Sequence, residues 1–187
     1  MPGSVYSPLA DRVRELRGPV HPLNVGDTWR EPFEGGRMED LTSSAHPGLH
    51  RYCETAGIPP LVDALVEKVR ERGMPCERDE VVVTAGATSG LSCAVSALVD
   101  PGEEVLILAP FWPLIRGIVQ AQRGRAVEVP FYDRVASPEQ AVEAIEAQLT
   151  ERSVALYVCT PSNPTGRVLT GPWLEALAEL ARRHDLW

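Results

Sequence analysis

Lysine is nearly absent from this chain. Of the 18 basic residues only Lys68 is a lysine, so 17 are arginine (18 − 1 = 17). Acidic residues outnumber basic ones by 26 to 18 over 187 residues, which gives a net charge of −8, and the basic residues form no cluster. Nucleic-acid binding depends on neutralising phosphates with Lys and Arg. The composition therefore argues against nucleic acid as the main partner and favours a small soluble ligand.

Long apolar runs are missing as well. No stretch approaches the roughly 20 apolar residues that a membrane-spanning helix needs. Near the N-terminus, Asp11, Arg12, Arg14 and Glu15 stand where a signal peptide would need an apolar run. We therefore expect a cytoplasmic protein that does not associate with a membrane.

The cysteines lack the spacing of a metal site or a redox pair. The four of them form no CxxC motif, and no histidine stands at a zinc-ligand interval from them. Two of them lie inside apolar runs. We interpret Cys53, Cys76, Cys93 and Cys159 as buried thiols rather than as metal ligands or redox groups.

The first 50 residues differ in composition from residues 51–187. They contain six prolines and several glycines, so we expect an N-terminal arm with a short helix near residues 8–17. Pro59 and Pro60 then begin a segment in which apolar side chains recur at helical spacing, and Gly73 follows as a C-terminal cap. These apolar positions are Leu61, Val62, Leu65, Val66 and Val69, with Lys68 on the wet side.

Apolar, strand-like runs alternate with helical segments from residue 81 onward. The expected strands are residues 81–84, 104–109, 126–129 and 154–159, and the expected helices follow the loop at 85–90 and span 113–123, 138–149 and, after a Thr170 cap, 172–184. Ser137 to Gln140 has the capping-box pattern with proline at the first helical position, and Leu186 and Trp187 resemble the start of a fifth strand.

This alternation indicates an α/β fold. Near-continuous apolar strands that are joined by helices are typical of a mainly parallel sheet with helices on both faces. Ligands bind such sheets outside the carboxyl ends of the strands. The loops that follow the strands are therefore the expected place for a ligand site.

The loop after the first expected strand is built from small residues. It reads TAGATSG from Thr84 to Gly90. Small residues let backbone N–H groups approach a ligand, and the following helix directs its positive end at the same place, which predicts a phosphate cup. The motif is neither GxGxxG nor GxxxxGK[ST], so a dinucleotide or P-loop site lacks its own signature. A tight turn without a ligand is the alternative.

Two further loops contain proline-flanked functional groups. Pro110 to Pro113 reads PFWP, which places aromatic rings at a strand end where they can stack on a planar ligand or lie in the core. Pro161 to Gly166 reads PSNPTG, which holds Asn163 between two prolines in a narrow orientation. An X–Pro bond at such a position can be cis.

Together these motifs resemble the class I/II aminotransferase family of fold-type I pyridoxal-phosphate enzymes. GAT, PFWP and SNPTG occur in the family's order at the expected element ends. Tyr52 and Gly57 resemble the family's Y-x4-G segment before a helix. The likeness covers about residue 23 to residue 187, which corresponds to the N-terminal half of such an enzyme, so the α/β fold is expected to be the incomplete large domain.

The resemblance implies a pyridoxal 5'-phosphate cofactor and a role for each matching residue. Gly86, Ala87 and Thr88 would hold the phosphate. Trp112 would stack on the pyridine ring, and Asn163 would donate a hydrogen bond to the phenolic oxygen of the ring.

A homodimer and a substrate pocket are implied in the same way. The residue matching Tyr52 reaches the phosphate bound by the neighbouring subunit in this family. Leu23 to Asp27 resembles the stretch that closes over the substrate, with Gly26 near the substrate carboxylate. Trp29 is a further candidate for that pocket.

The catalytic lysine of the family is expected beyond Trp187, together with the carboxylate that binds the ring nitrogen and the C-terminal small domain. Lys68 does not fit that lysine because it lies on the polar face of an early helix, before the sheet. We therefore expect the front portion of an enzyme that moves an amino group between an amino acid and a 2-oxo acid, inactive alone and completed by a longer or complementing chain.

Three alternatives remain open from the residues. One is another fold-type I reaction, such as that of a lyase or a decarboxylase. Another is a non-catalytic interaction module derived from the fold. A nucleotide-binding α/β protein is the weakest alternative, because both glycine fingerprints are missing.

Overall fold

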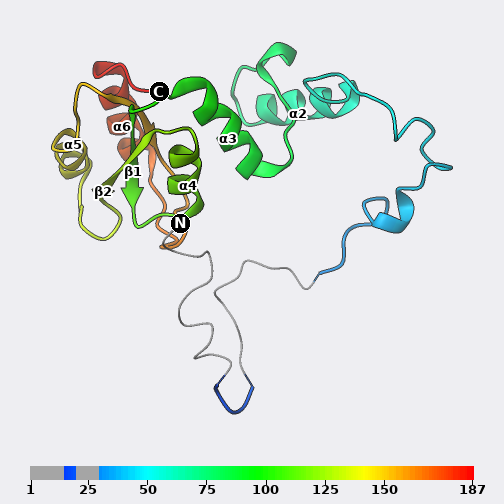
Figure 1. Cartoon of the computed structure of the whole chain (residues 1–187), viewed down its shortest axis with the longest axis horizontal. Helices are drawn as coiled ribbons and strands as arrows, with labels where there is room; N and C mark the ends of the chain where they lie inside the picture. Colours follow the sequence, from blue (N-terminus) through cyan, green and yellow to red (C-terminus); the bar gives the residue numbers. More distant parts are fainter. Residues whose placement is uncertain (1–14, 20–29) are drawn as a thin grey trace. The chain divides into compact units, whose positions relative to one another are not determined.

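The computed structural model describes residues 15–19 and 30–187 of the chain (Figure 1). It divides the chain into two compact units, Met1–Val83 and Thr84–Trp187, and each unit is described by itself. The helix predicted near residues 8–17 falls largely outside the described residues. The predicted boundary between residues 50 and 51 stays a prediction.

The first unit is built around helix α2, Pro59–Glu71, with the short 3-10 helices η1, Met38–Asp40, and η2, Arg78–Glu80. Proline begins α2 as predicted, since the first helical turn does not need its N–H. Val62 and Val66 form a small core with Cys76, whereas Leu61 and Leu65 lie on an exposed face. The wet side of α2 contains Lys68, which is 63% exposed and forms an ion pair with Glu71 at 3.1 Å.

The second unit contains a three-stranded parallel sheet in the order β2-β1-β3. Its strands are β1, Glu104–Ala109, β2, Arg125–Pro130, and β3, Ser153–Tyr157, and its helices are α3, Gly86–Leu98, α4, Leu114–Ala121, α5, Pro138–Glu146, and α6, Gly171–Arg183. The α/β fold class predicted from the alternation is confirmed. The predicted start of α3 is wrong, because this helix begins at Gly86, inside the loop predicted at residues 85–90. The predicted boundaries of the observed strands and of α4, α5 and α6 lie within three residues of the observed ones, where fraying makes boundaries variable.

The central strand β1 separates two apolar cores. Leu106 and Leu108 pack with buried residues of α5 and α6, while Val105 and Ile107 pack with α4 and the apolar side of α3. Successive side chains of a strand point to opposite faces, so one buried strand supplies both cores. Helices therefore cover both faces of the sheet, as the near-continuous apolar pattern of residues 104–109 predicts.

The first predicted strand is wrong. Residues 81–84 form no strand, and Val83 N donates a hydrogen bond to Ala56 O at 2.8 Å inside the first unit. A β-branched run becomes a strand only beside another strand, and the sheet in the described part of the chain offers it no pairing. The prediction that Leu186 and Trp187 start a fifth strand agrees better with the structure. Trp187 N donates a hydrogen bond to Val154 O, and Leu156 N donates one to Trp187 O, both at 2.9 Å.

The structure supports the predicted cap of α5 but shows no side-chain cap at the start of α6. Ser137 Oγ accepts a hydrogen bond from Gln140 N at 3.3 Å, and Gln140 Oε1 accepts one from Ala136 N at 2.9 Å, so a capping arrangement begins α5. Thr170 occupies the N-cap position of α6, but its side chain makes no capping hydrogen bond.

The interpretation of all four cysteines as buried thiols is wrong. Cys76 is buried and Cys159 is partly buried, whereas Cys53 and Cys93 are exposed. Cys93 lies in an apolar run, yet its position on α3 faces away from the core that Val95 and Leu98 contact. Among the described residues, no group of three His, Cys, Asp or Glu side chains is placed to hold a metal ion. None of the described helices has both the length and the apolar character needed to cross a membrane.

Candidate functional site

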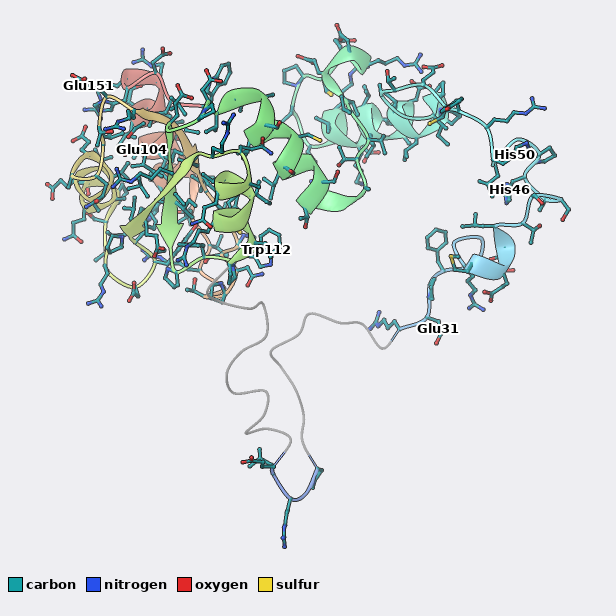
Figure 2. All side chains as sticks on the ribbon, viewed as in Figure 1. Glu31, His46, His50, Glu104, Trp112 and Glu151 are labelled. Carbon is teal, nitrogen blue, oxygen red and sulfur yellow. The ribbon has the colours of Figure 1, made fainter. Side chains whose placement is uncertain are left out.

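The loops that contain Trp112 and Asn163 leave the same edge of the sheet. β1 and β3 are parallel neighbours, so the residues that follow Ala109 and Tyr157 emerge together at the carboxyl edge. Figure 2 labels Trp112 at this end of β1 and Glu104 at the other end. The structure thus brings together two of the three loops that the sequence singled out.

The Asn163 loop is a closed turn. Ser162 N donates a hydrogen bond to Arg167 O at 2.9 Å, and Gly166 N donates one to Ser162 O at 2.7 Å. The Thr160–Pro161 and Asn163–Pro164 peptide bonds are cis. Asn163 is exposed and Ser162 is buried, so the turn presents the Asn163 amide to solvent.

Trp112 is half-buried. It packs against a core cluster whose fully buried members are Val99, Val105, Ile107, Ile115 and Val119. The ring therefore has one supported side, and its exposed remainder is available to a ligand. This geometry suits a rigid stacking surface, because a packed ring loses little freedom when a ligand binds.

The Gly86 loop forms an uncapped helix start. Gly86 N donates to Thr84 O at 2.8 Å, and α3 begins at Gly86 without a side-chain cap. The next two N–H groups, of Ala87 and Thr88, have no intrahelical partner by helix geometry, and both residues are exposed. Free N–H groups at the positive end of a 13-residue helix fit a phosphate.

The structure does not tie this helix start to the other two loops. Residues 81–84 form no strand of the sheet, so the sheet does not place the turn that follows them. α3 is held instead by its later residues, Val95 and Leu98, which pack on the core between α4 and the sheet. No described hydrogen bond joins residues 86–88 to the Trp112 or Asn163 loop.

The remaining candidates lie in the first unit or outside the described residues. Tyr52 is fully exposed and lines a cavity of about 480 Å³ with neighbours from residues 48–59. Gly57 has φ +124°, and a Cβ atom there would lie 2.5 Å from Val83 Cγ2, so the Y-x4-G spacing ends at a position that only glycine fits. Gly26 and Trp29 lie outside the described residues.

A polar cavity at the carboxyl edge was missed by sequence reasoning. It has a volume of about 450 Å³ and is lined by the proline-rich loop after β1 and by charged side chains. Arg116 pairs with Glu128 and lies 5.1 Å from the centre of the Phe111 ring. These residues come from separate segments, so no local motif could have indicated the cavity.

Tyr132 was also missed. It follows β2, is 5% exposed, and packs edge-on against Phe131 with ring centres 5.1 Å apart. Burial raises the pKa of its hydroxyl above the ordinary 10.0, which outweighs the hydrogen bond with the Cys159 backbone that lowers it. Burial likewise raises the pKa of Tyr157.

Residues 22–187 match the family model for aminotransferase class I and II. The chain belongs to this family. The match covers both described loops at the sheet edge and the start of α3. It confirms the family resemblance that the GAT, PFWP and SNPTG motifs carried, and the members of this aminotransferase family generally use pyridoxal phosphate.

Curated relatives support the same membership. The aspartate/prephenate aminotransferase of Thermus thermophilus is 41% identical over 144 residues, which is 75% of this chain and 36% of that protein. The arginine–pyruvate transaminase of Pseudomonas aeruginosa is 35% identical over 141 residues, again 75% of this chain and 36% of the relative. The chain therefore spans little more than a third of the length of these aminotransferases.

Solved structures show the same partial coverage. The aspartate aminotransferase of Thermus thermophilus with maleate superposes with a TM-score of 0.67 at 38% identity, over 73% of this chain and 36% of that one. The N-succinyldiaminopimelate aminotransferase of Mycobacterium tuberculosis gives 0.67 at 34% identity, over 74% and 37%. This chain thus contains part of the family fold.

Proposed function

We propose that this chain is the N-terminal, cofactor-holding part of a pyridoxal-phosphate-dependent aminotransferase. The observation that carries the proposal is the placement of the family's motif residues in the matched region. Trp112 and Asn163 lie at one edge of the parallel sheet, and Gly86 begins an uncapped helix. An anion site, a supported aromatic ring and an exposed amide are the groups that a phosphorylated pyridine requires.

Each part of the cofactor has a partner in this proposal. Gly86, which has no side chain, would let the phosphate approach the backbone, and the N–H groups of Ala87 and Thr88 and the Thr88 hydroxyl would bind it. Trp112 would stack on the ring, and Asn163 would donate to the phenolic oxygen. When bound, pyridoxal phosphate acts as an electron sink for the substrate amino acid. The residues of this chain would bind and orient it.

Substrate and subunit contacts belong to the proposal as well. Gly26 and Trp29 would line the side of the pocket that receives an amino acid or a 2-oxo acid. Tyr52 is free to contact another molecule because its side chain is fully exposed. We propose that it reaches the phosphate bound by a second copy of the chain, in a homodimer. The cytoplasmic location stays a prediction.

We further propose that this chain does not transaminate by itself. The family reaction needs a lysine amine that is displaced by the substrate. Lys68 is the only lysine here, and its ion pair with Glu71 and its 63% exposure are those of a solvated surface residue. The names of the relatives favour transamination over a lyase or decarboxylase reaction.

Cofactor binding is tested by equilibrium dialysis of the chain against pyridoxal phosphate. The wild type should bind, and Asn163→Ala should weaken binding about tenfold, because one hydrogen bond to a charged group contributes about 1.5 kcal/mol. Gln148→Ala, another exposed amide, should change nothing. A wild type that does not bind, or equal affinities of the two variants, would overturn the proposal.

Catalysis is tested separately. The chain alone, incubated with amino acids, a 2-oxo acceptor and pyridoxal phosphate, should release no more 2-oxo acid than the cofactor does without protein. Turnover that depends on Lys68, detected with Lys68→Gln, would contradict the proposed need for a completing segment while leaving cofactor binding intact.

A further inference from the structure

The loop that presents Asn163 is closed by its own backbone hydrogen bonds and is also held from outside. The Asn163 side chain makes no described hydrogen bond, and the adjacent Ser162 has a buried Oγ atom without a partner. Buried polar side chains normally anchor a turn through hydrogen bonds. Ser162 does not, so the direction of the Asn163 amide depends on what fixes the two ends of the loop.

We propose that Tyr132 and Arg167 are positioning residues that together fix both ends of this loop and thereby aim the Asn163 amide. The proposal rests on the proposed function only in its second part, the effect on pyridoxal phosphate. Its first part, the fixing of the loop, concerns this chain alone.

Tyr132 fixes the incoming end. Its hydroxyl donates a hydrogen bond to Cys159 O at 2.5 Å and accepts one from Cys159 N at 3.3 Å. The pairing of β3 with β1 ends at Tyr157, so Cys159 lies two residues beyond the last residue that the sheet holds. Tyr132 follows β2, which lies at the opposite edge of the sheet from β3. Its hydrogen bonds thus extend the restraint on the chain from the end of β3 toward Asn163.

Arg167 fixes the outgoing end. Its Nη1 atom donates to Tyr132 O at 2.8 Å and to Val135 O at 2.9 Å, and its guanidinium lies 4.6 Å from the centre of the Trp173 ring. Its backbone carbonyl accepts the hydrogen bond from Ser162 N that closes the turn. Arg167 therefore joins the loop to the segment that contains Tyr132.

The two anchors are connected and symmetric about the amide. Cys159 precedes Asn163 by four residues and Arg167 follows it by four, and both are bonded to Tyr132. Hydrogen bonds from a guanidinium to buried carbonyls are among the stronger ones in proteins, and the planar fork fixes their direction. A turn that is held at both ends in this way leaves the amide little freedom to rotate with the backbone.

Hydrogen exchange tests, without any ligand, whether Tyr132 and Arg167 restrain the Asn163 loop. In Tyr132→Phe and in Arg167→Met, the amide protons of Ser162 and Gly166 should exchange at least tenfold faster, relative to Leu106 in β1 of the same variant. Thr150→Val is the matched control, since it removes two hydrogen bonds of one hydroxyl, to Glu104 Oε2 and from Arg152 N, at the opposite end of the sheet. Unchanged relative exchange in the two variants would overturn the proposal.

A double-mutant cycle tests the effect on the cofactor. Tyr132→Phe should weaken pyridoxal phosphate binding about fivefold in the wild type and not at all in Asn163→Ala, because the tyrosine acts only through the amide. Arg167→Lys should restore part of the affinity lost in Arg167→Met. An equal loss in both backgrounds would indicate general destabilisation and refute the positioning role. If the wild type binds no cofactor, the proposed function fails, and hydrogen exchange alone decides whether the two residues hold the loop.

Discussion

The side chain of Glu104 is 2% exposed, whereas that of Arg125, which donates a hydrogen bond to it at 2.9 Å, is 69% exposed. The second carboxylate oxygen of Glu104 accepts hydrogen bonds from Thr150 Oγ1 at 2.7 Å and from Ser153 Oγ at 3.3 Å. One buried carboxylate thus joins β1 to β2, to the first residue of β3 and to the segment before β3 at the amino edge of the sheet. The Trp112 and Asn163 loops of the candidate site lie at the opposite edge.

Replacing Glu104 should therefore destabilise the second unit without touching the site. Glu104→Ala should lower the free energy of unfolding by about 3 kcal/mol, because a buried network loses its common acceptor. Thr150→Val should cost about 1 kcal/mol. Glu151→Ala is the matched control, since Glu151 is an exposed carboxylate near the same edge (Figure 2). Urea unfolding measures all three, and a Glu104→Ala cost equal to that of Glu151→Ala would contradict the structural role.

Gly86 should resist substitution for a conformational reason. Its φ is +80°, and a Cβ atom there would meet no atom within 4 Å, so the cost of Gly86→Ala is backbone strain alone, about 1 kcal/mol. Gly171 occupies the first position of α6, also in open space, without a positive φ. Gly171→Ala should leave stability unchanged or raise it slightly. The temperature of thermal unfolding should thus fall in Gly86→Ala and not in Gly171→Ala, and equal shifts would contradict the strain argument.

The stability of the chain should fall at high pH. Burial raises the pKa of Tyr132 and Tyr157 above the ordinary 10.0, so the unfolded chain loses these protons before the folded chain does. The contribution is fully present below pH 10 and is lost as pH rises through the folded pKa values. Urea unfolding from pH 8 to 11 should show a decline that is smaller in Tyr132→Phe. Identical declines in the variant and the wild type would contradict the raised pKa of Tyr132.

Local sequence patterns predicted the structural features that depend on residues close together in the chain. The apolar run of residues 104–109 indicated a strand buried on both faces, and it supplies both cores. Pro138 after Ser137 marked the start of α5 because capping is a short-range interaction. The loop motifs were found for the same reason, since each is a contiguous run at an element end.

The features that the sequence did not reveal depend on contacts between residues that are far apart in the chain. The run at 81–84 has strand composition, but a strand needs a neighbour, and composition does not show whether one is present. Tyr132 and Arg167 meet across 35 residues of chain, at 2.8 Å, so neither lies in a recognisable motif. Cys93 lies in an apolar run but on an exposed face of its helix, so an apolar run does not by itself predict that each of its residues is buried.

Substitution of Gly57 in the first unit has two costs, which are backbone strain and a collision with Val83. Gly57→Ala combines backbone strain at φ +124° with a Cβ atom 2.5 Å from Val83 Cγ2. We expect it to destabilise the unit by about 3 kcal/mol, which sums strain and overpacking. Gly73→Ala is the matched control: its φ is +79° and its Cβ would lie in open space, so strain alone should cost about 1 kcal/mol.

A second substitution isolates the overpacking. Val83→Ala removes Cγ2, the atom nearest to the new Cβ at 2.5 Å, but keeps Val83 Cβ at 2.9 Å, so Gly57→Ala should cost less in the Val83→Ala background than in the wild type. The strain at Gly57 remains, which keeps the cost above zero. Hydrogen exchange of the α2 amides measures each variant within the first unit. Additive costs of the two substitutions would show that the two side chains do not collide, because only residues in contact couple.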